Sequence, residues 1–402
     1  MQKPESYIYK EIEYELLPIS DVTENDIQRE INHLGEKILE RTALFSRING
    51  KESYISKLAN NTPVVNMAKK KIKYFKQNRY IIGQGVHSIF PYQGKSKPWL
   101  VKFLLNSLGS FEKINVFDPM CGSGTTLIES ILGGHNAYGT DISAFGQILS
   151  TIKLNALKGD KNDIVEFNKI ISSYSSYEIN PFKNINDMER LGESIPYDLF
   201  ILTVINSIGY NKRRSKYHNS KFGEQLQFIS QQTSNFLNCY YETRDKYNFN
   251  FGDFQVFKFD ARKIIFKQNS MDLVVTSPPY LDTIDYPVRD NEILHFLNEN
   301  PIGIRSQVIG TQGTLHNKII SFFQGMIKVA ENISNVLKPD SKAIIIVGNY
   351  SISENKRVLL THLTETAMIM SGFSLEKTRK FKLNGYNNFM ETEIVQTYRL
   401  IE

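Results

Sequence analysis

The chain has 402 residues, of which 41% are hydrophobic and 22% charged, a globular composition long enough for a large core and an additional module. Its formal net charge of +6 is mildly basic, which permits a polyanionic partner without requiring one. Two cysteines argue against a disulfide framework and a Cys-rich zinc site, so we expect a reducing setting and no metal.

Residues 1–85 are predicted to form a mostly helical N-terminal segment, with apolar residues at helical spacing over Asp21–Ala43. Met1–Glu5 lacks the apolar core of a signal peptide, and no run reaches the roughly 18 apolar residues that span a membrane. We therefore expect a cytoplasmic protein without a membrane partner. The stretch 68–80 mixes cations with aromatic side chains, which suits phosphates and bases or, alternatively, a solvated helix face. The candidate nucleic-acid contacts in it are Lys69, Lys70, Lys71 and Arg79.

A Gly-rich turn between a predicted strand at 114–117 and a predicted helix at 127–132 is the first candidate ligand site. The turn reads Asp118-Pro119-Met120-Cys121-Gly122-Ser123-Gly124-Thr125-Thr126. Strand, Gly-rich turn and helix start form the layout of a nucleotide-binding crossover, because glycines let the backbone approach a ligand. Leu127 replaces the third glycine of the dinucleotide fingerprint, and Thr125 replaces the phosphate-loop lysine. We therefore favour contact with a ribose or an amino-acid group over a plain tight turn.

A second candidate lies at the end of the next predicted strand, 136–141. Asp141 follows the Gly-rich turn by about 20 residues, which places a carboxylate where it can accept both hydroxyls of a ribose. The alternative is an N-cap for a helix at 142–156, and the two roles are compatible.

The alternation of strands and helices stops between residues 159 and 251. Helical pieces are predicted at Leu199–Ile208 and Glu224–Leu237. So long an insertion in a doubly wound domain is usually a functional module, and the alternative is a helical cover over one sheet face. A cationic cluster within it provides four more candidate DNA contacts, Lys212, Arg213, Arg214 and Lys216.

The alternation resumes with a strand at 254–259, which ends at Asp260, and with a buried parallel strand predicted at 271–275. The motif Thr276-Ser277-Pro278-Pro279-Tyr280 then ends this strand, because the prolines have no N–H to donate. We expect the Ser277 hydroxyl and the Pro278 carbonyl to accept hydrogen bonds from an amino group, and Tyr280 to stack on a base. An ordinary Pro-Pro turn is the alternative. Further elements are predicted at 291–297, 319–337 and 358–370 (helices) and at 342–348, 375–383 and 394–400 (strands).

Together, these strand-end motifs resemble the S-adenosylmethionine-dependent amino-methyltransferases of DNA. The 276–280 motif is similar to that of the cytosine-N4 branch, since adenine-N6 members usually have Asp or Asn at Ser277. The Gly-rich turn is similar to the family's cofactor loop, and 91–100 to its cofactor-flanking segment. The implied cofactor-binding residues are Asp118, Pro119, Cys121, Gly122, Gly124, Thr125, Asp141 (ribose), Ile142, Asp260 (adenine amine), Ala261 and Ser277. The implied catalytic residues are Ser277, Pro278, Pro279 and Tyr280.

The resemblance implies an α/β fold, a Rossmann-like doubly wound sheet of the class I methyltransferase type. It would be built from 86–158 and 252–402, with the helical insert 159–251 reading the DNA sequence. The implied reaction is methylation of cytosine N4 in double-stranded DNA by base flipping and direct transfer, in a restriction-modification or related defence system with a cognate restriction endonuclease.

Other activities are left open by the sequence. Methylation at carbon 5 would need a cysteine nucleophile near the base, whereas Cys121 lies in the cofactor turn and Cys239 lacks a Pro-Cys context. The alternatives are methylation of adenine N6 in DNA, methylation of an amine in RNA, and a non-catalytic DNA-binding module.

Overall fold

The computed structural model describes residues 85–174 with short gaps, 190–208, 222–244, 251–281 except 264, 285–348, 350–353, 356–382 and 392–401, together with 8–9, 47–48 and 51–52. The candidate DNA contacts at 69–79 and 212–216, and the helix expected at 21–43, lie outside these residues.

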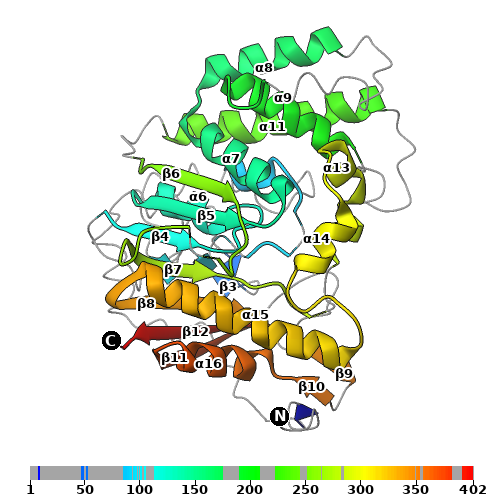
Figure 1. Ribbon diagram of the computed structural model, residues 1–402. Helices are drawn as coiled ribbons and strands as arrows, with labels where there is room; N and C mark the ends of the chain where they lie inside the picture. The colour runs from blue at the N-terminus through cyan, green and yellow to red at the C-terminus, as the bar shows by residue number, and fades with distance from the viewer. Residues whose placement is uncertain are drawn as a thin grey trace.

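A seven-stranded mixed sheet forms the centre of the molecule (Figure 1). From one edge to the other its strands are β11 (Phe373–Lys382), β12 (Thr392–Leu400), β8 (Leu337–Val347), β7 (Met271–Thr276), β4 (Asn115–Asp118), β5 (Asn136–Asp141) and β6 (Phe254–Lys258). The strands from β6 to β8 are parallel, whereas β12 is antiparallel to both of its neighbours. The order therefore differs from the doubly wound order 3-2-1-4-5-6 only by one antiparallel strand inserted near an edge. This confirms the predicted Rossmann-like sheet of the class I methyltransferase type.

Both faces of the sheet are covered, as alternating side chains require. Val275 and Ile344 pack on one face against a helical stretch that includes Leu104. On the other face, Val274 and Ile345 pack against α15 (Leu315–Val336), and α16 (Leu360–Met370) lies beside α15. The central strands are therefore apolar on both sides, which explains why they appear in the sequence as short continuous apolar runs.

The point where the strand order reverses lies between β4 and β7. Strand β4 is followed by α6 (Thr125–Leu132), and β5 by α7 (Ala144–Lys158). In open α/β sheets, the crevice beyond the carboxyl ends of the strands at this point is the usual ligand site. The fold therefore directs attention to the ends of β4, β5 and β7, where three of the predicted motifs stand.

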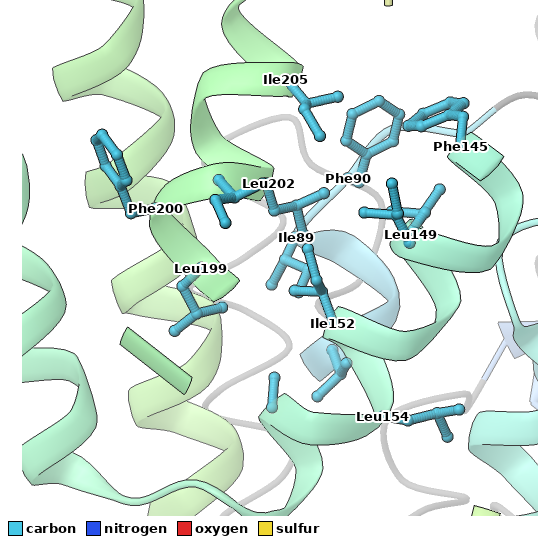
Figure 2. Close-up of a cluster of buried hydrophobic side chains, with 14 of the residues drawn as sticks. Ile89, Phe90, Phe145, Leu149, Ile152, Leu154, Leu199, Phe200, Leu202 and Ile205 are labelled. Carbon is cyan, nitrogen blue, oxygen red and sulfur yellow. The ribbon is translucent and has the colours of Figure 1, made fainter. Parts of the chain in front are cut away.

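The described helices of the insert are α8 (Lys161–Tyr174), α9 (Ile195–Ser207) and α11 (Phe222–Arg244). They share one hydrophobic core with α6 and α7. Figure 2 shows Leu199 and Leu202 of α9 facing Ile152 of α7 across Ile89. These helices thus form a further layer over α7 and share its hydrophobic core.

Strands at the N-terminus were not predicted. β1 (Ile8–Tyr9) pairs with β10 (Lys356–Val358), which pairs with β9 (Tyr350–Ser353), and β2 (Arg47–Ile48) pairs with β3 (Lys51–Glu52). Two-residue strands carry no periodic signal, and β1 depends on a partner far along the chain. The local sequence therefore could not indicate them.

Three short helices connect β7 to α15. They are α12 (Tyr286–Arg289), α13 (Asn291–Phe296) and α14 (Pro301–Gln307), and they lie along the end of the sheet near α7 (Figure 1). A short 3-10 helix, η3 (Gly85–Ser88), precedes the sheet and contacts α7 and α11. In the part of the chain that the structure describes, no helix is long and apolar enough to cross a membrane.

Candidate active site

A cavity of about 1150 Å³, counting the part open to solvent, lies at the carboxyl ends of β4, β5 and β7. Every cofactor-binding residue predicted from the sequence lines it, with the single exception of Gly124. Ser277 and Pro279 of the proline loop also line it, whereas Pro278 and Tyr280 do not. The structure thus brings these motifs together at one cavity.

The Gly-rich turn is held in shape by its own backbone. The Gly124 N–H donates to the Cys121 carbonyl (2.8 Å), and Gly124 adopts φ of 77° immediately before the first turn of α6. A Cβ at Gly124 would lie 2.7 Å from the Ser150 Cβ of α7. Gly124 therefore has a left-handed conformation and a close contact with α7 that only glycine allows. It packs on the α7 side of the turn and does not line the cavity.

Asp141 joins the turn to the second strand. Its carboxylate accepts hydrogen bonds from the N–H groups of Gly122 (2.9 Å) and Ser143 (2.9 Å). Burial raises the pKa of Asp141 to about 6, these two hydrogen bonds oppose the rise, and the charge of Glu299 adds to it. With both oxygens fixed by backbone donors, the remaining lone pairs can accept hydrogen bonds from a ligand such as a diol.

Glu299 is a second carboxylate at this corner that the sequence did not indicate. It accepts a hydrogen bond from the Ala144 N–H (2.9 Å) at the start of α7, and it forms an ion pair with Lys258 at the end of β6. The side chain of Glu299 is 5% exposed. It therefore caps α7 and ties that helix to the segment between α13 and α14.

Asp118 connects the ends of the two central strands. Its Oδ1 accepts hydrogen bonds from the Thr276 hydroxyl (2.7 Å) and from the Met120 N–H (3.1 Å). Burial raises the pKa of Asp118 to about 6, although hydrogen bonds from Thr276 and Thr126 act in the opposite direction. Asp118 thus fixes the Gly-rich turn to the strand that carries the proline loop.

Asp260, the residue expected to hold an adenine amine, is engaged by its neighbour. Arg262 donates from Nε to Oδ1 (2.9 Å) and from Nη2 to Oδ2 (2.7 Å), and its Nη2 also donates to the Gln307 carbonyl (2.9 Å). Burial acts to raise the pKa of Asp260, but the hydrogen bonds from Arg262 outweigh it and lower that pKa. An amine at this position would therefore share the carboxylate with Arg262.

The proline loop carries its two hydroxyl groups in one chain of hydrogen bonds. Ser277 Oγ lies 3.1 Å from the Tyr280 hydroxyl, which in turn donates to the Ile346 carbonyl (3.5 Å). Tyr280 itself packs on the apolar cluster that contains Leu281 and Phe322. Ser277 thus reaches the cavity, while the Tyr280 ring supports it from the protein side.

The cavity wall also includes residues that were not predicted, among them Tyr92, Lys95, Tyr286 and Asp290. The rings of Tyr92 and Tyr286 are stacked, with centroids 5.9 Å apart and planes at 14°. Lys95 Nζ donates to the His87 carbonyl (3.0 Å). Tyr92 and Lys95 fall within the 91–100 segment that the family resemblance indicated, whereas Tyr286 and Asp290 carry no local signal.

The donor set of the cavity fits a cationic ligand with hydroxyl and amino groups. Among the lining residues, the carboxylates of Asp118, Asp141, Asp260 and Asp290 outnumber the cations Lys95 and Arg262. The Thr125 hydroxyl is buried at the cavity wall and has no hydrogen-bond partner among the described residues. A polar group of a ligand would satisfy it, because buried hydroxyl groups in proteins are almost always hydrogen-bonded. These residues therefore suit S-adenosyl-L-methionine.

Two other chemistries can be examined in the described residues. Burial raises the pKa of the Cys121 thiol well above its usual range, so at neutral pH it is a protonated, weak nucleophile. The described residues contain no group of three or more His, Cys, Asp or Glu side chains placed to hold a metal ion.

Comparison with known proteins places the Gly-rich turn in a methyltransferase-like segment. Residues 90–173 match the family model described as UPF0020: RMKL-like, methyltransferase domain. Over 108 residues the chain is 36% identical to the Type II methyltransferase M.MjaII of Methanocaldococcus jannaschii. The aligned segment covers 27% of this chain and 19% of the relative. This chain therefore aligns with about a fifth of the length of that curated relative.

Solved structures give weaker likenesses. TrmN from Thermus thermophilus has 13% identity and a TM-score of 0.34, over 79% of this chain and 52% of TrmN. A SAM-dependent methyltransferase from Methanosarcina mazei has 10% identity and a TM-score of 0.33, over 72% of this chain and 94% of the other.

Proposed function

We propose that this protein is an S-adenosyl-L-methionine-dependent methyltransferase that acts on the exocyclic N4 amine of cytosine in duplex DNA. The observation that carries the proposal is the single cavity whose wall includes the Gly-rich turn, Asp141 and Ser277. The match of 90–173 to a methyltransferase-domain model and the partial similarity to a type II methyltransferase support the reaction class.

The cofactor would be held at the ends of β4, β5 and β6. Asp141 is placed to accept hydrogen bonds from the ribose hydroxyls, and Ile142 and Ala261 offer apolar contact to the adenine. The carboxylate excess of the cavity favours a positively charged ligand. When bound, S-adenosyl-L-methionine supplies an electrophilic methyl group on its sulfonium.

The Ser277–Tyr280 pair supports an amine as the methyl acceptor. A hydroxyl carries one proton, so if Tyr280 donates its proton to the Ile346 carbonyl, Ser277 must donate to Tyr280. Ser277 then has only lone pairs left for the cavity and is an acceptor there. An amino group can donate to it, whereas a carbonyl cannot. Such a hydrogen bond draws the nitrogen lone pair out of conjugation and makes the amine more nucleophilic.

The reaction needs no enzyme nucleophile. Holding the amine and the methyl group in a near-attack geometry can account for about 7–11 kcal/mol of the barrier. The protonated, buried Cys121 argues against carbon-5 methylation, which needs a thiolate. The target base would leave the duplex at a cost of a few kcal/mol.

For the biological setting, we place the enzyme in a restriction-modification or related defence system, with a cognate restriction endonuclease that recognises the same site. The insert 159–251 would contribute sequence recognition through its cationic segment. Protection of one DNA sequence from cleavage, in cells that express the protein, tests this setting.

The proposal is tested by measuring cofactor binding and methyl transfer separately. By calorimetry, the wild type should bind S-adenosyl-L-methionine, and Asp141→Ala should bind it at least about tenfold more weakly, since a hydrogen bond to a charged group contributes about 1.5–3 kcal/mol. With saturating tritiated cofactor and unmethylated DNA, Ser277→Ala should transfer far less label than the wild type. Glu166→Ala, an exposed carboxylate on α8, is the matched control. Unchanged binding by Asp141→Ala would refute the cofactor site, and full transfer by Ser277→Ala would refute the catalytic loop.

A further inference from the structure

Arg262 lines the cavity, and its guanidinium group holds the carboxylate of Asp260. Nε donates to Oδ1 (2.9 Å) and Nη2 donates to Oδ2 (2.7 Å), so the two side chains form a bidentate pair. Paired bonds of this kind fix the direction of a carboxylate as well as attracting it. The Arg262 side chain is 28% exposed and that of Asp260 is 18% exposed. Arg262 therefore determines which way the Asp260 carboxylate points.

This pairing leaves acceptor capacity on Oδ2 of Asp260. An ionised carboxylate has about four acceptor sites, two on each oxygen. The backbone N–H of Arg262 (3.0 Å) and its Nε use the sites of Oδ1, and Nη2 uses one site of Oδ2. The longer contact from Nε to Oδ2 (3.2 Å) shares a hydrogen atom with the bond to Oδ1. The site that remains on Oδ2 can accept an N–H from a ligand but cannot pair with a carbonyl.

The turn that carries Asp260 stands beside Asp141. The Phe259 N–H donates to the Asp141 carbonyl (2.7 Å), which joins the end of β6 to the end of β5. Asp260 and Ala261 follow directly in the chain, and both line the cavity together with Asp141. A nucleoside whose ribose is bound at Asp141 can therefore reach Asp260 with the edge of its base.

The backbone of this turn is held from the side of α15. Asn332 is 3% exposed, and its Nδ2 donates to the carbonyls of Ala261 (2.9 Å) and Lys263 (2.6 Å). The Asp260 carbonyl also accepts the Lys263 N–H (2.9 Å). These bonds do not involve the Arg262 side chain. A substitution at Arg262 therefore leaves the turn anchored and changes the direction of the carboxylate.

Helix α14 fixes the guanidinium group from the other side. Nη2 of Arg262 also donates to the carbonyl of Gln307 (2.9 Å), the last residue of α14. The last carbonyls of a helix have no partner within it and favour a nearby cation. Arg262 thus has a defined position between α14 and the turn, which a residue that orients another one requires.

The charges around Asp260 keep it a hydrogen-bond acceptor. Burial acts to raise the pKa of Asp260, but hydrogen bonds from Arg262 and the charges of Arg262 and Lys263 lower that pKa below its usual value. From α14 and α15, the contacts to the turn come from the Gln307 carbonyl and the Asn332 amide, which do not titrate. At neutral pH the carboxylate is therefore ionised and only accepts hydrogen bonds.

We propose that Arg262 is a positioning residue for cofactor recognition, which directs Oδ2 of Asp260 toward the 6-amino group of adenine and so makes the site prefer adenine to a purine without this amine. This inference rests on the proposed function, because it assigns the adenine end of the same cofactor site. It adds a second residue to the expectation from the sequence, in which Asp260 alone held the amine.

Calorimetry with two ligands tests this preference. The ligands are S-adenosylhomocysteine and its analogue in which unsubstituted purine replaces adenine. The wild type should bind S-adenosylhomocysteine about 10- to 150-fold more tightly than the analogue, the range for one hydrogen bond to a charged group. In Arg262→Met this preference should be largely lost, because nothing then directs the carboxylate toward the amine.

Two further variants separate orientation from charge and from folding. Arg262→Lys keeps the positive charge without the planar fork, so it should restore the preference only in part. Lys263→Met is the matched control, because it removes an exposed cation of the same turn that acts on Asp260 through its charge, and it should keep the full preference. If Arg262→Met weakens the binding of both ligands equally and keeps their ratio, Arg262 has a structural role only, and the inference is overturned.

The wild type offers a measurement that needs no variant. Protonation of Asp118 or Asp141 changes the affinity for both ligands alike, so the ratio of their dissociation constants reports on Asp260. Because the pKa of Asp260 is lowered, this ratio should be constant from pH 8 to pH 5, and a ratio that falls over this range would overturn the inference. Equal binding of both ligands by the wild type would overturn it as well, without affecting the proposed reaction. No binding of S-adenosylhomocysteine would instead refute the proposed function itself.

Discussion

Asp141 combines burial, a neighbouring charge and a ligand-facing position. Its pKa of about 6, like that of Asp118, lies above the ordinary value of 3.8 because burial disfavours the charged form. A group whose pKa is raised by folding favours the folded state below its unfolded pKa, and that contribution is lost as pH rises through about 6. In the ligand-free protein, both carboxylates therefore oppose folding at neutral pH. A bound cation that pairs with these carboxylates would offset part of the free-energy cost of burying them.

The affinity for S-adenosyl-L-methionine should consequently depend on pH. Binding requires ionised carboxylates, so we expect the affinity to be constant above pH 7 and to weaken below 6. The loss should approach about tenfold per pH unit for each group that must lose a proton. Asp141→Asn should bind S-adenosyl-L-methionine weakly at pH 8, and its affinity should change less with pH than that of the wild type. Calorimetry at pH 5, 6, 7 and 8 measures both curves, and equal affinity at pH 5 and 8 would contradict the assignment.

A substitution at Glu299 can shift the pKa of Asp141 while the Asp141 side chain, which would contact the ligand, stays unchanged. The charge of Glu299 contributes to the raised pKa of Asp141, and its side chain caps α7. Glu299→Gln keeps an oxygen that can accept the Ala144 N–H but removes the charge. The pKa of Asp141 should fall, so the midpoint of the binding profile should move to lower pH. Glu166→Gln should leave the midpoint in place, and a midpoint that is the same in both variants would refute the coupling.

At the level of the element, α7 approaches Asp141 at a glycine. A Cβ at Gly146 would lie 2.5 Å from Cγ and 2.6 Å from Oδ1 of Asp141. Gly146→Ala should displace this carboxylate and weaken cofactor binding at least about tenfold, by losing one charged hydrogen bond. The Tm should change little, because alanine favours a helix interior by about 0.5–1 kcal/mol over glycine and offsets part of the strain.

The matched control for this helix is Gly303→Ala in α14, where a new Cβ would make only ordinary contacts of 3.5 Å or more. If Gly146→Ala binds the cofactor as tightly as Gly303→Ala does, the close contact between Gly146 and Asp141 does not determine the position of the Asp141 carboxylate.

The long, periodic elements could be predicted from the sequence, and the short ones could not. β5 has the predicted bounds, and the apolar run at 271–275 is the buried parallel strand that was expected. By contrast, α14 has seven residues, too few for a helical period to emerge. Strand β8 begins at Leu337, earlier than predicted, because Leu337 pairs with Met271 of β7, whereas the next three residues, 338–340, are exposed and give no apolar pattern.

The site follows the same division. Asp118, Asp141 and Ser277 stand at the ends of strands, so their convergence follows from the doubly wound topology. Tyr92 and Tyr286 lie far apart in the chain, and nothing local indicates that they stack. The ion pair of Arg262 with Asp260 is close in sequence, but only the backbone turn at Ala261 directs the two side chains together.

For the whole molecule, the proposed DNA substrate predicts salt-dependent binding, and the net charge of +6 is compatible with it. Replacing Lys212, Arg213, Arg214 and Lys216 by alanine should weaken DNA binding and leave cofactor binding unchanged. The plot of log affinity against log salt should become shallower by about 0.9 for each phosphate that the variant no longer neutralises. A second variant with alanine at Lys69, Lys70, Lys71 and Arg79 compares the N-terminal segment with the insert. An unchanged salt slope in the first variant would remove the insert from the DNA-binding surface.

The most direct test is the identity of the methylated product. Unmethylated duplex DNA is incubated with the protein and S-adenosyl-L-methionine that carries a trideuterated methyl group, then digested to nucleosides and analysed by mass spectrometry. We expect the label in N4-methyldeoxycytidine. Label in N6-methyldeoxyadenosine would contradict the choice of base, and no label in any nucleoside of this DNA, from protein that binds the cofactor, would contradict the proposed activity.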